Sequence, residues 1–340
     1  MATIKDIARL SGYSVGTVSR VINQHPDVSA ETREKILKII KEENFQPNSN
    51  ARLLKQTHAS AISVIVKGTD NLFLNSLLEK VQSQLRSHGE EATVIFLKEA
   101  DNEVQYAVQF SRERNPKGLI FLGGDLENFR RSFEEIDTPA VLVAADASQL
   151  DFANLSSFST DDYAGAREAV TRLIASGHQK IGIIGGFATF EENQVSSQRL
   201  QGAIDVMREN GLKFDRKKDY QESIFAMKDG YENTRNLLKK NPKITAIFAL
   251  SDMIAIGAMR AVHDAGMRVP EDISVIGYDG IEYTRYTLPR LATVRQDIDE
   301  LARKSVEDLL FRISYPRKAV HKRIPFELIG EDSIAQRQKD

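Results

Sequence analysis

From residue 60 onward, short apolar runs alternate with longer stretches in which apolar residues recur at helical spacing. Apolar runs separated by helices of about ten to fifteen residues are typical of parallel sheets with both faces covered. The predicted strands span 61–66, 92–97, 118–122, 140–144, 180–184, 220–225, 245–250 and 273–278. The predicted helices span about 74–88, 102–114, 163–176, 197–210, 230–240, 252–265 and 297–313. This many strands suits two doubly wound sheets better than one, and ligands of such folds bind beyond the carboxyl ends of the strands.

The first 45 residues show a different pattern, with three helical periods and no strand signal. Thr3, Ser14 and Ser29 are each placed to cap one short helix. The predicted core residues are Ile4, Ile7, Ala8, Val18, Val21, Ile22, Ile36, Leu37, Ile39 and Ile40. The first two helices are joined by a turn containing Gly12, which indicates a helix-turn-helix whose second helix enters the DNA major groove. A small three-helix domain of another purpose fits the same pattern.

Residues 45–58 have the composition of a linker. Pro47 ends the preceding helix, and Asn48 or Ser49 could cap a short helix that runs through Leu54. A helix of fewer than about 12–15 residues is marginal alone in water. We therefore expect this segment to become ordered only against a partner.

The charge of the chain is unevenly distributed. The total is 46 basic against 48 acidic side chains, but residues 1–60 hold nine basic against six acidic ones. A difference of this size is common by chance, so it supports nucleic-acid binding only together with the helix-turn-helix pattern.

Composition excludes several classes of protein. The absence of cysteine excludes a disulfide scaffold, a thiolate zinc site and a cysteine nucleophile. The longest apolar runs fall well short of the ~20 residues of a membrane span, and no leader is evident, so we expect a cytoplasmic protein. The six histidines are scattered, and we find no dinucleotide fingerprint, Walker loop or nucleophile elbow. We therefore expect no enzyme, no cofactor and no metal.

Several sequence blocks carry a family resemblance. Residues 3–23 read TIKDIARLSGYSVGTVSRVIN, and VSAETR follows at 28–33 and Pro47-Asn48 after that. Later blocks are GHQKIGIIGG at 177–186, RLQG at 199–202, SDMIAIG at 251–257 and VPEDISVIGYD at 269–279. In this order they resemble the LacI/GalR family of bacterial transcription repressors over nearly the whole chain.

The resemblance implies three parts. These are a DNA-binding headpiece at 1–45, a hinge helix at 46–58, and an effector-binding and dimerisation core at 59–340 that is similar to periplasmic sugar-binding proteins. Within the core it implies an N-subdomain of about 59–160 and 292–320. The C-subdomain would then be about 161–291 and 321–340, with the chain crossing near 160, 291 and 321.

The resemblance also implies which residues contact double-stranded DNA. They are Thr3, Ser14, Val15, Gly16, Thr17, Ser19, Arg20, Asn23, Asn48, Ala51 and Leu54. Val15 can offer bases only apolar contact, whereas Gly16 either permits close approach or merely weakens its helix by ~1 kcal/mol. Leu54 either inserts between base pairs in the minor groove or packs together with Leu53 on the core.

For the effector, the resemblance carries over best to Arg199 and Asp279. A guanidinium donates paired hydrogen bonds and a carboxylate accepts them from sugar hydroxyls, although a surface ion pair and a turn residue are the alternatives. Weaker candidates are Phe73, Asp161, Phe225 and Ser251, of which the aromatics could equally be core residues. Ser251 departs from the asparagine of the lactose repressor, and Asp252 is expected to cap the following helix.

Together these observations predict a homodimeric repressor of carbohydrate-utilisation genes that binds a pseudo-palindromic operator. A small sugar or phosphosugar between the core subdomains would change its operator affinity. The alternative is a family member switched by a protein partner or a purine corepressor. A sugar-binding protein without DNA function and an enzyme on the same fold are the rivals from other classes. The C-terminal tail lacks leucine heptads, which favours a dimer over a tetramer.

Overall fold

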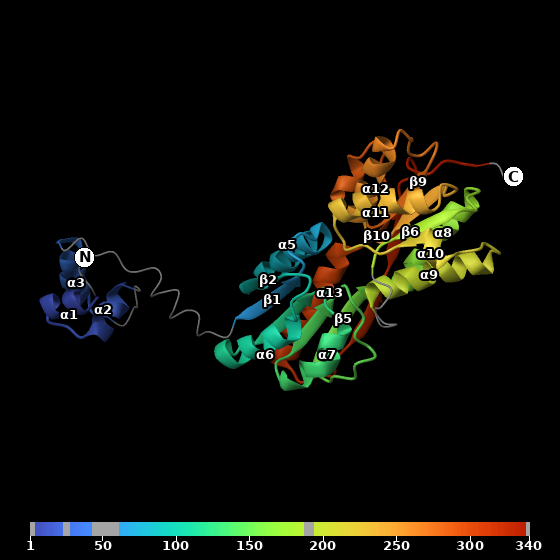
Figure 1. Ribbon diagram of the computed structural model, residues 1–340. Helices are drawn as coiled ribbons and strands as arrows, with labels where there is room; N and C mark the ends of the chain where they lie inside the picture. Colours follow the sequence, from blue (N-terminus) through green and yellow to red (C-terminus); the bar gives the residue numbers. More distant parts are fainter. Residues whose placement is uncertain (1–3, 23–27, 43–60, 187–193, 338–340) are drawn as a thin grey trace. The chain divides into compact units, whose positions relative to one another are not determined.

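The computed structural model describes residues 4–22, 28–42, 61–186 and 194–337. The chain divides into two compact units, Met1–Ala59 and Ser60–Asp340. Figure 1 shows their elements, and each unit is considered by itself. No helix in the described part of the chain is long and apolar enough to cross a membrane.

The N-terminal unit is a three-helix headpiece formed by α1 (Ile4–Ser11), α2 (Val15–Ile22) and α3 (Ala30–Glu42). The buried apolar residues are Ile7, Ala8, Val18, Val21 and Ile36. Ser14 Oγ accepts from Thr17 N at 3.1 Å and Ser29 Oγ accepts from Thr32 N at 3.3 Å, so these two predicted caps are present, whereas Thr3 lies outside the described residues. The prediction that Leu37 belongs to the core is wrong, because it is 47% exposed and lies on the outer side of α3.

The N-terminal subdomain of the second unit is a six-stranded parallel sheet in the order β11-β5-β4-β3-β1-β2. The strands are β1 (Ile62–Lys67), β2 (Ala92–Leu97), β3 (Gly118–Leu122), β4 (Ala140–Val143), β5 (Leu155–Thr160) and β11 (His321–Ile324). The helices are α5 (Leu72–Ser87), α6 (Glu103–Arg114), α7 (Leu126–Ser132) with the 3-10 turn η1 (Phe133–Glu135), and α13 (Ile298–Ser314). Because α5 and α13 share one hydrophobic cluster with the sheet and α6 and α7 another, both faces are covered.

The C-terminal subdomain is a second sheet in the order β12-β10-β9-β8-β6-β7, in which only β12 is antiparallel to its neighbour. The strands are β6 (Ile181–Ile184), β7 (Tyr220–Gln221), β8 (Ala246–Ala249), β9 (Ser274–Asp279), β10 (Ala292–Gln296) and β12 (Phe326–Ile329). The helices are α8 (Asp162–Ala175), α9 (Val195–Glu209), α10 (Arg216–Asp219), α11 (Met227–Lys240), α12 (Asp252–Asp264) and the 3-10 turn η2 (Glu282–Arg285). Helices α8 and α9 pack on one face and α11 and α12 on the other.

The chain passes three times between the two sheets. The first crossing follows Thr160, as predicted. The other two differ from the prediction, because β10 pairs with β9 and β11 pairs with β5. The second crossing therefore follows Gln296 rather than 291, and the third lies between Ile324 and Phe326 rather than at 321.

Candidate functional site

A cleft of about 450 Å³ lies between the two subdomains, at the carboxyl ends of strands from both sheets. Its walls include residues that directly follow or end β1, β3, β4, β6, β7 and β9. The volume lies in the range of ~300–1,000 Å³ that is usual for small-molecule sites. Switch points of this kind are where doubly wound folds bind their ligands.

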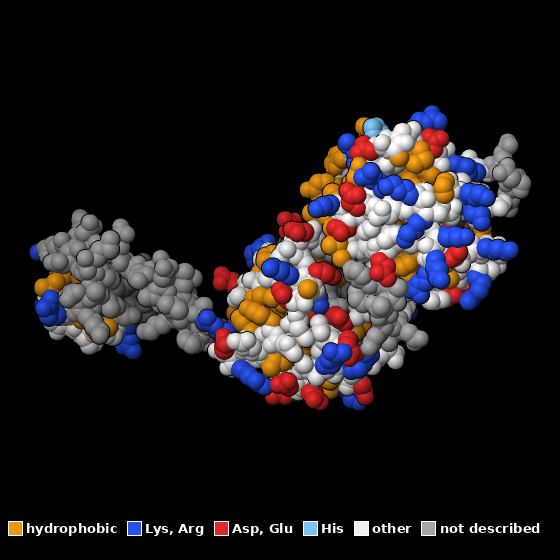
Figure 2. Space-filling view, viewed as in Figure 1, with side chains coloured by type: hydrophobic (Ala, Val, Ile, Leu, Met, Phe, Trp, Pro, Cys, Tyr) orange, Lys and Arg blue, Asp and Glu red, His pale blue; other side chains and the backbone are white. Residues whose placement is uncertain are grey.

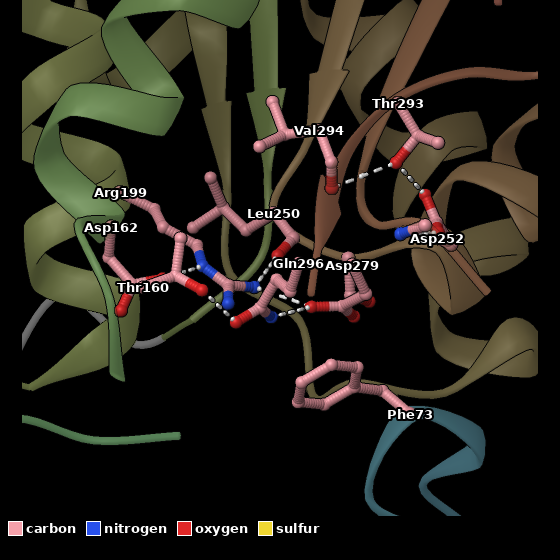
Figure 3. Close-up of polar contacts among 12 residues, drawn as sticks. Phe73, Thr160, Asp162, Arg199, Leu250, Asp252, Asp279, Thr293, Val294 and Gln296 are labelled. Atoms are coloured by element: carbon pink, nitrogen blue, oxygen red, sulfur yellow. Dashed lines mark hydrogen bonds and ion pairs between the residues drawn. The ribbon is translucent and has the colours of Figure 1, made fainter. Parts of the chain in front are cut away.

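Arg199, in the first turns of α9, is buried in the wall of this cleft (Figure 3). Its Nε donates to Asp162 Oδ1 at 2.7 Å, and its Nη1 donates to the Leu250 carbonyl at 2.6 Å and to Asp279 Oδ1 at 3.3 Å. The guanidinium carbon lies 3.7 Å from the centre of the Tyr278 ring. Burial lowers the pKa of Arg199, but the two carboxylates outweigh it and raise the pKa, so the side chain stays charged. Among the described residues, Nη2 has no hydrogen-bond acceptor.

Asp279 ends β9 beside Arg199, and its carboxyl group is held from a second side. Gln296 Nε2 donates to Asp279 Oδ1 at 2.9 Å, and Thr160 Oγ1 donates to Gln296 Oε1 at 2.7 Å. Burial raises the pKa of Asp279 to about 6, although the Arg199 charge opposes the rise. The backbone of Asp279 has φ of 117°, which is rare for any residue other than glycine.

Asp252 stabilises the turn that follows Asp279. Its Oδ2 accepts from Gly280 N at 2.7 Å and Ile281 N at 2.9 Å, and its Oδ1 accepts from Thr293 Oγ1 at 2.6 Å (Figure 3). The prediction that Asp252 caps α12 is therefore wrong. Ser251 is the cap, because its Oγ accepts from Ile254 N at 3.3 Å. Ser251 is buried under α12 and is not among the described lining residues of the cleft.

The two predicted aromatic residues line the cleft, and Asp161 does not. Phe73, in the first turn of α5, faces Asp279 from the opposite subdomain (Figure 3), and Phe225 is half-buried. Asp161 caps α8 by accepting from Ala164 N at 3.0 Å and also accepts from Arg323 at 2.7 Å. It lines a separate cavity of about 130 Å³ at the subdomain crossing.

The N-terminal wall contains polar residues that were not predicted from the sequence. Lys67 at the end of β1 donates to the fully buried Glu103 at 2.6 Å, and Glu103 also accepts from the backbone N of Asp125 at 2.6 Å. Asp125 caps α7, and Gln194 of the C-terminal subdomain donates to it across the cleft. Glu99 follows β2 and also lines the cleft. Lys67, Glu99 and Asp125 lie at a strand end or within three residues of one, and this position was the sequence signal that could have found them.

The second helix of the headpiece presents several of the predicted DNA-contacting residues. Val15 is 42% exposed, Gly16 and Arg20 are exposed, and Thr17 is half-buried and contacts Ser14 through their hydroxyl groups at 2.9 Å. The backbone of Ser19 belongs to the same helix, but its side chain is not described. The predicted contacts that lie outside the described residues are Thr3, Asn23, Asn48, Ala51 and Leu54.

A Cβ atom placed on Gly16 would meet only the Ser14 hydroxyl, at an ordinary 3.6 Å. Packing inside the headpiece therefore does not require glycine at this position. In the parts of the chain that are described, no group of three or more histidine, aspartate or glutamate side chains could hold a metal ion.

The two units match two known protein families. Residues 3–48 match the bacterial regulatory proteins of the lacI family, and residues 170–334 match a periplasmic binding protein-like domain. The HTH-type transcriptional regulator MalR of Clostridium butyricum is 38% identical over 339 residues, covering 97% of this chain and 98% of that protein.

Solved structures agree in fold over nearly the full length. A lac repressor dimer bound to operator and an anti-inducer is 27% identical, with a TM-score of 0.73, and covers 98% of this chain and 99% of its own. The transcriptional regulator CelR in complex with cellobiose is 25% identical, with a TM-score of 0.73. The match covers 98% of this chain and 100% of the CelR chain. Members of this family are DNA-binding transcription regulators rather than enzymes. The chain belongs to the lacI family of bacterial regulatory proteins.

Proposed function

We propose that this regulator represses carbohydrate-utilisation genes and that a small sugar or phosphosugar, bound between the core subdomains, changes its operator affinity. The observation that carries the proposal is the cleft in which Arg199 and Asp279 are buried side by side, facing Phe73. A guanidinium, a carboxylate and an aromatic ring together suit a hydroxyl-rich ring with apolar faces. The cellobiose bound by the related CelR is of this chemical kind.

The proposed switch depends on residues from both subdomains meeting at the effector. Phe73, Glu99 and Asp125 belong to the N-terminal wall, whereas Arg199 and Asp279 belong to the C-terminal wall. An effector that contacts both walls favours one relative orientation of the subdomains over another. Operator affinity then changes only as far as the effector binds the two states differently.

The headpiece would read one half of a near-palindromic operator through α2. Exposed Val15, Gly16 and Arg20 supply apolar contact, close approach and a charged donor along one helix. A dimer would supply two such helices, and half-site spacing would follow from its two-fold symmetry. Because bacterial operator DNA lies in the cytoplasm, we propose that the protein acts there.

Exposed apolar side chains of the core support a homodimer. Phe96 on the edge strand β2 is 48% exposed, and Tyr286 and Leu288 after η2 are 75% and 97% exposed. Figure 2 shows hydrophobic side chains gathered over the β2 edge and beside α11 and α12. Apolar patches of this kind on a protomer mark association surfaces.

Selection of bound DNA from a random pool tests the proposal directly. The full chain should enrich one palindromic sequence, and a panel of sugars, phosphosugars and purines should contain a sugar that changes its affinity for that sequence. The affinity should also fall steeply with salt, because phosphate contacts release counterions. Failure to enrich a palindrome would refute operator reading. Response to a purine alone, or only to an added protein, would refute the sugar effector.

A further inference from the structure

We infer that the effector carries no negative charge and that Glu99 and Asp125, on the N-terminal wall of the cleft, accept hydrogen bonds from its hydroxyl groups. This inference rests on the proposed function and narrows it, because it excludes phosphosugars and uronates. It also gives a recognition role to two residues outside the Arg199 and Asp279 pair.

The charges of the cleft support an effector without negative charge. The charged residues that line it are two cations, Lys67 and Arg199, and three carboxylates, those of Glu99, Asp125 and Asp279. Each cation is already paired with a buried carboxylate, Lys67 with Glu103 at 2.6 Å and Arg199 with Asp162 at 2.7 Å. Both positive charges in the described part of the cleft are therefore already balanced by a buried carboxylate, although Arg199 Nη2 keeps a donor without a described acceptor. A phosphate there would meet an excess of negative charge.

The sequence of the neighbouring segment does not change this balance. Residues 187–193, which precede α9 and are not described, contain Glu191 and Glu192 but no lysine or arginine. They cannot supply the missing cation.

One feature of the cleft favours an anion, but it is weaker than the carboxylates. The first turn of α9 lines the cleft through Val195 and Ser196, and its N-cap residue Gln194 makes no side-chain capping bond. A helix N-terminus corresponds to about half an elementary positive charge. Glu99 and Asp125 together contribute two full negative charges, so the net preference is against an anion.

Free acceptor atoms support the role of Glu99 and Asp125 in binding hydroxyl groups. Glu99 is exposed at the cleft, and no hydrogen bond joins its carboxylate to another described residue. Asp125 uses Oδ1 for both the α7 cap and Gln194, which leaves Oδ2 without a described partner. A carboxylate is an acceptor only, so it suits hydroxyl donors and repels phosphate and carboxylate groups. The Asp279 carboxylate faces the same space from the opposite wall.

Calorimetric titration of the full-length protein with matched pairs tests the inference. The pairs are glucose, galactose, ribose and cellobiose, each with its own phosphate ester, together with glucuronate, galacturonate and inorganic phosphate. We expect at least one neutral sugar to bind, and its phosphate ester to bind at least ten-fold more weakly. We expect no binding of inorganic phosphate. A phosphate ester or uronate that binds as tightly as the neutral sugar would overturn the inference.

The variants Glu99→Gln and Asp125→Asn test the two residues. Both keep the size of the side chain, and Asn at 125 still offers an oxygen to the α7 cap. Each substitution should lower the affinity for the neutral sugar by about ten-fold, as expected for losing a charged acceptor. Each should also reduce the difference in affinity between the neutral sugar and its phosphate ester. Glu113→Gln, an exposed residue of α6 in the same subdomain, is the matched control and should change neither affinity.

The two proposals fail in different ways. Unchanged affinity of both cleft variants, with thermal stability preserved, would remove Glu99 and Asp125 from recognition. If a phosphate ester binds tightly and changes operator affinity, the proposed function stands and this inference is wrong. If none of the sugars or esters binds, the proposed function fails and the inference fails with it.

Discussion

Gln296 donates to the cleft carboxylate of Asp279 at 2.9 Å, and its side-chain oxygen accepts from Thr160 at 2.7 Å. Thr160 ends β5 and Gln296 ends β10, so both lie at points where the chain crosses between subdomains. This chain of two hydrogen bonds links the candidate effector carboxylate to two of the three crossings. It is a physical route by which ligand contact at Asp279 could bias the orientation of the subdomains.

Substitutions at the two ends of this chain should separate binding from response. Gln296→Met removes the donor that lowers the pKa of Asp279, so effector affinity should fall by about ten-fold. Thr160→Val leaves the bond between Gln296 and Asp279 intact, so effector affinity should change little while the effector-induced change in operator affinity decreases. Calorimetry and fluorescence anisotropy with labelled operator measure the two quantities. Equal loss of binding in both variants would contradict this separation.

Removing one partner of the ion pair between Arg199 and Asp162 should strongly destabilise the protein, because both side chains are buried and the other charge would be left uncompensated. Arg199→Met leaves two buried carboxylates without their counter-charge, and the free energy of unfolding should fall by about 3–5 kcal/mol. Adding Asp162→Asn should recover part of that loss, with a coupling energy of at least ~1 kcal/mol in a double-mutant cycle from urea unfolding.

The matched control is an ion pair at the surface that joins the same two helices, α8 and α9. Arg167 on α8 and Glu209 on α9 pair at 2.6 Å with both side chains partly exposed. Their cycle should give a coupling energy of about 0–1 kcal/mol, as for other exposed pairs. Similar coupling energies in the two cycles would mean that burial does not set the strength of the Arg199 pair.

Effector affinity should depend on pH through Asp279. Its pKa is raised to about 6, because burial disfavours the charged form while Arg199 only partly compensates. Hydroxyl groups donate to the ionised carboxylate, so affinity should be full above pH 7 and should fall up to ten-fold per unit as the pH drops below about 6. Asp162 and Asp252 are buried nearby. The Asp162 charge also raises the pKa of Asp279, and the Asp279 charge raises the pKa of Asp252.

Asp279→Asn provides the comparison for this pH dependence. The amide cannot ionise, so the variant should bind more weakly at pH 7 and show a flatter profile between pH 5 and 7. Titrations in one buffer series check both proteins. The opposite slope, with tighter binding in acid, would mean that the protonated carboxyl group is the form that binds.

Gly16→Ala distinguishes the two interpretations of the glycine in α2. The headpiece has space for the added methyl group, so the helix should gain about 1 kcal/mol of stability. If Gly16 permits close approach to bases, operator affinity should fall at least ten-fold despite the more stable headpiece. Thermal unfolding and gel-shift titration of the full chain measure the two effects. Unchanged or tighter operator binding would leave glycine without a role in DNA contact.

Leu288→Asp tests the proposed dimer surface. The side chain is 97% exposed in the protomer, so the substitution should leave the thermal stability of an isolated protomer nearly unchanged. A charge buried in a dimer interface is costly, so the dimer of the variant should dissociate at a higher protein concentration than the unmodified dimer. The variant should also bind operator more weakly. Light scattering and gel shifts measure both. Lys243→Asp, at an exposed loop, is the control, and equal behaviour of the two variants would place Leu288 outside the interface.

Local sequence signals were sufficient for much of the fold. Ser14 and Ser29 cap their helices as predicted, because capping depends on residues within one turn. The apolar runs became parallel strands because both faces of each sheet are covered. Arg199 and Asp279, predicted by resemblance from blocks 80 residues apart, meet in one cleft.

Other features were decided by contacts between distant segments. The strand β5, with sequence LSSFST, has no apolar run, yet it is buried between β4 and β11. Its serine hydroxyl groups are satisfied there, because Ser156 Oγ accepts from Val320 N at 2.9 Å and Ser157 Oγ accepts from Ala147 N at 3.0 Å. The short polar strand β11 was assigned to the wrong subdomain for the same reason, since only its pairing with β5 identifies its sheet.

By itself the sequence determined the helix-turn-helix headpiece and the two doubly wound sheets, and its family motifs pointed to Arg199 and Asp279, because periodicity, caps and family motifs are local. Only the tertiary structure decided that Ser251 caps α12 while Asp252 holds the turn at Gly280. It also decided that Glu99 and Asp125 face Asp279 across the cleft. A carboxylate has the same sequence signature whether it caps a helix, pairs with a lysine or faces a ligand. Its role is set by the donors and charges that folding brings within hydrogen-bond distance.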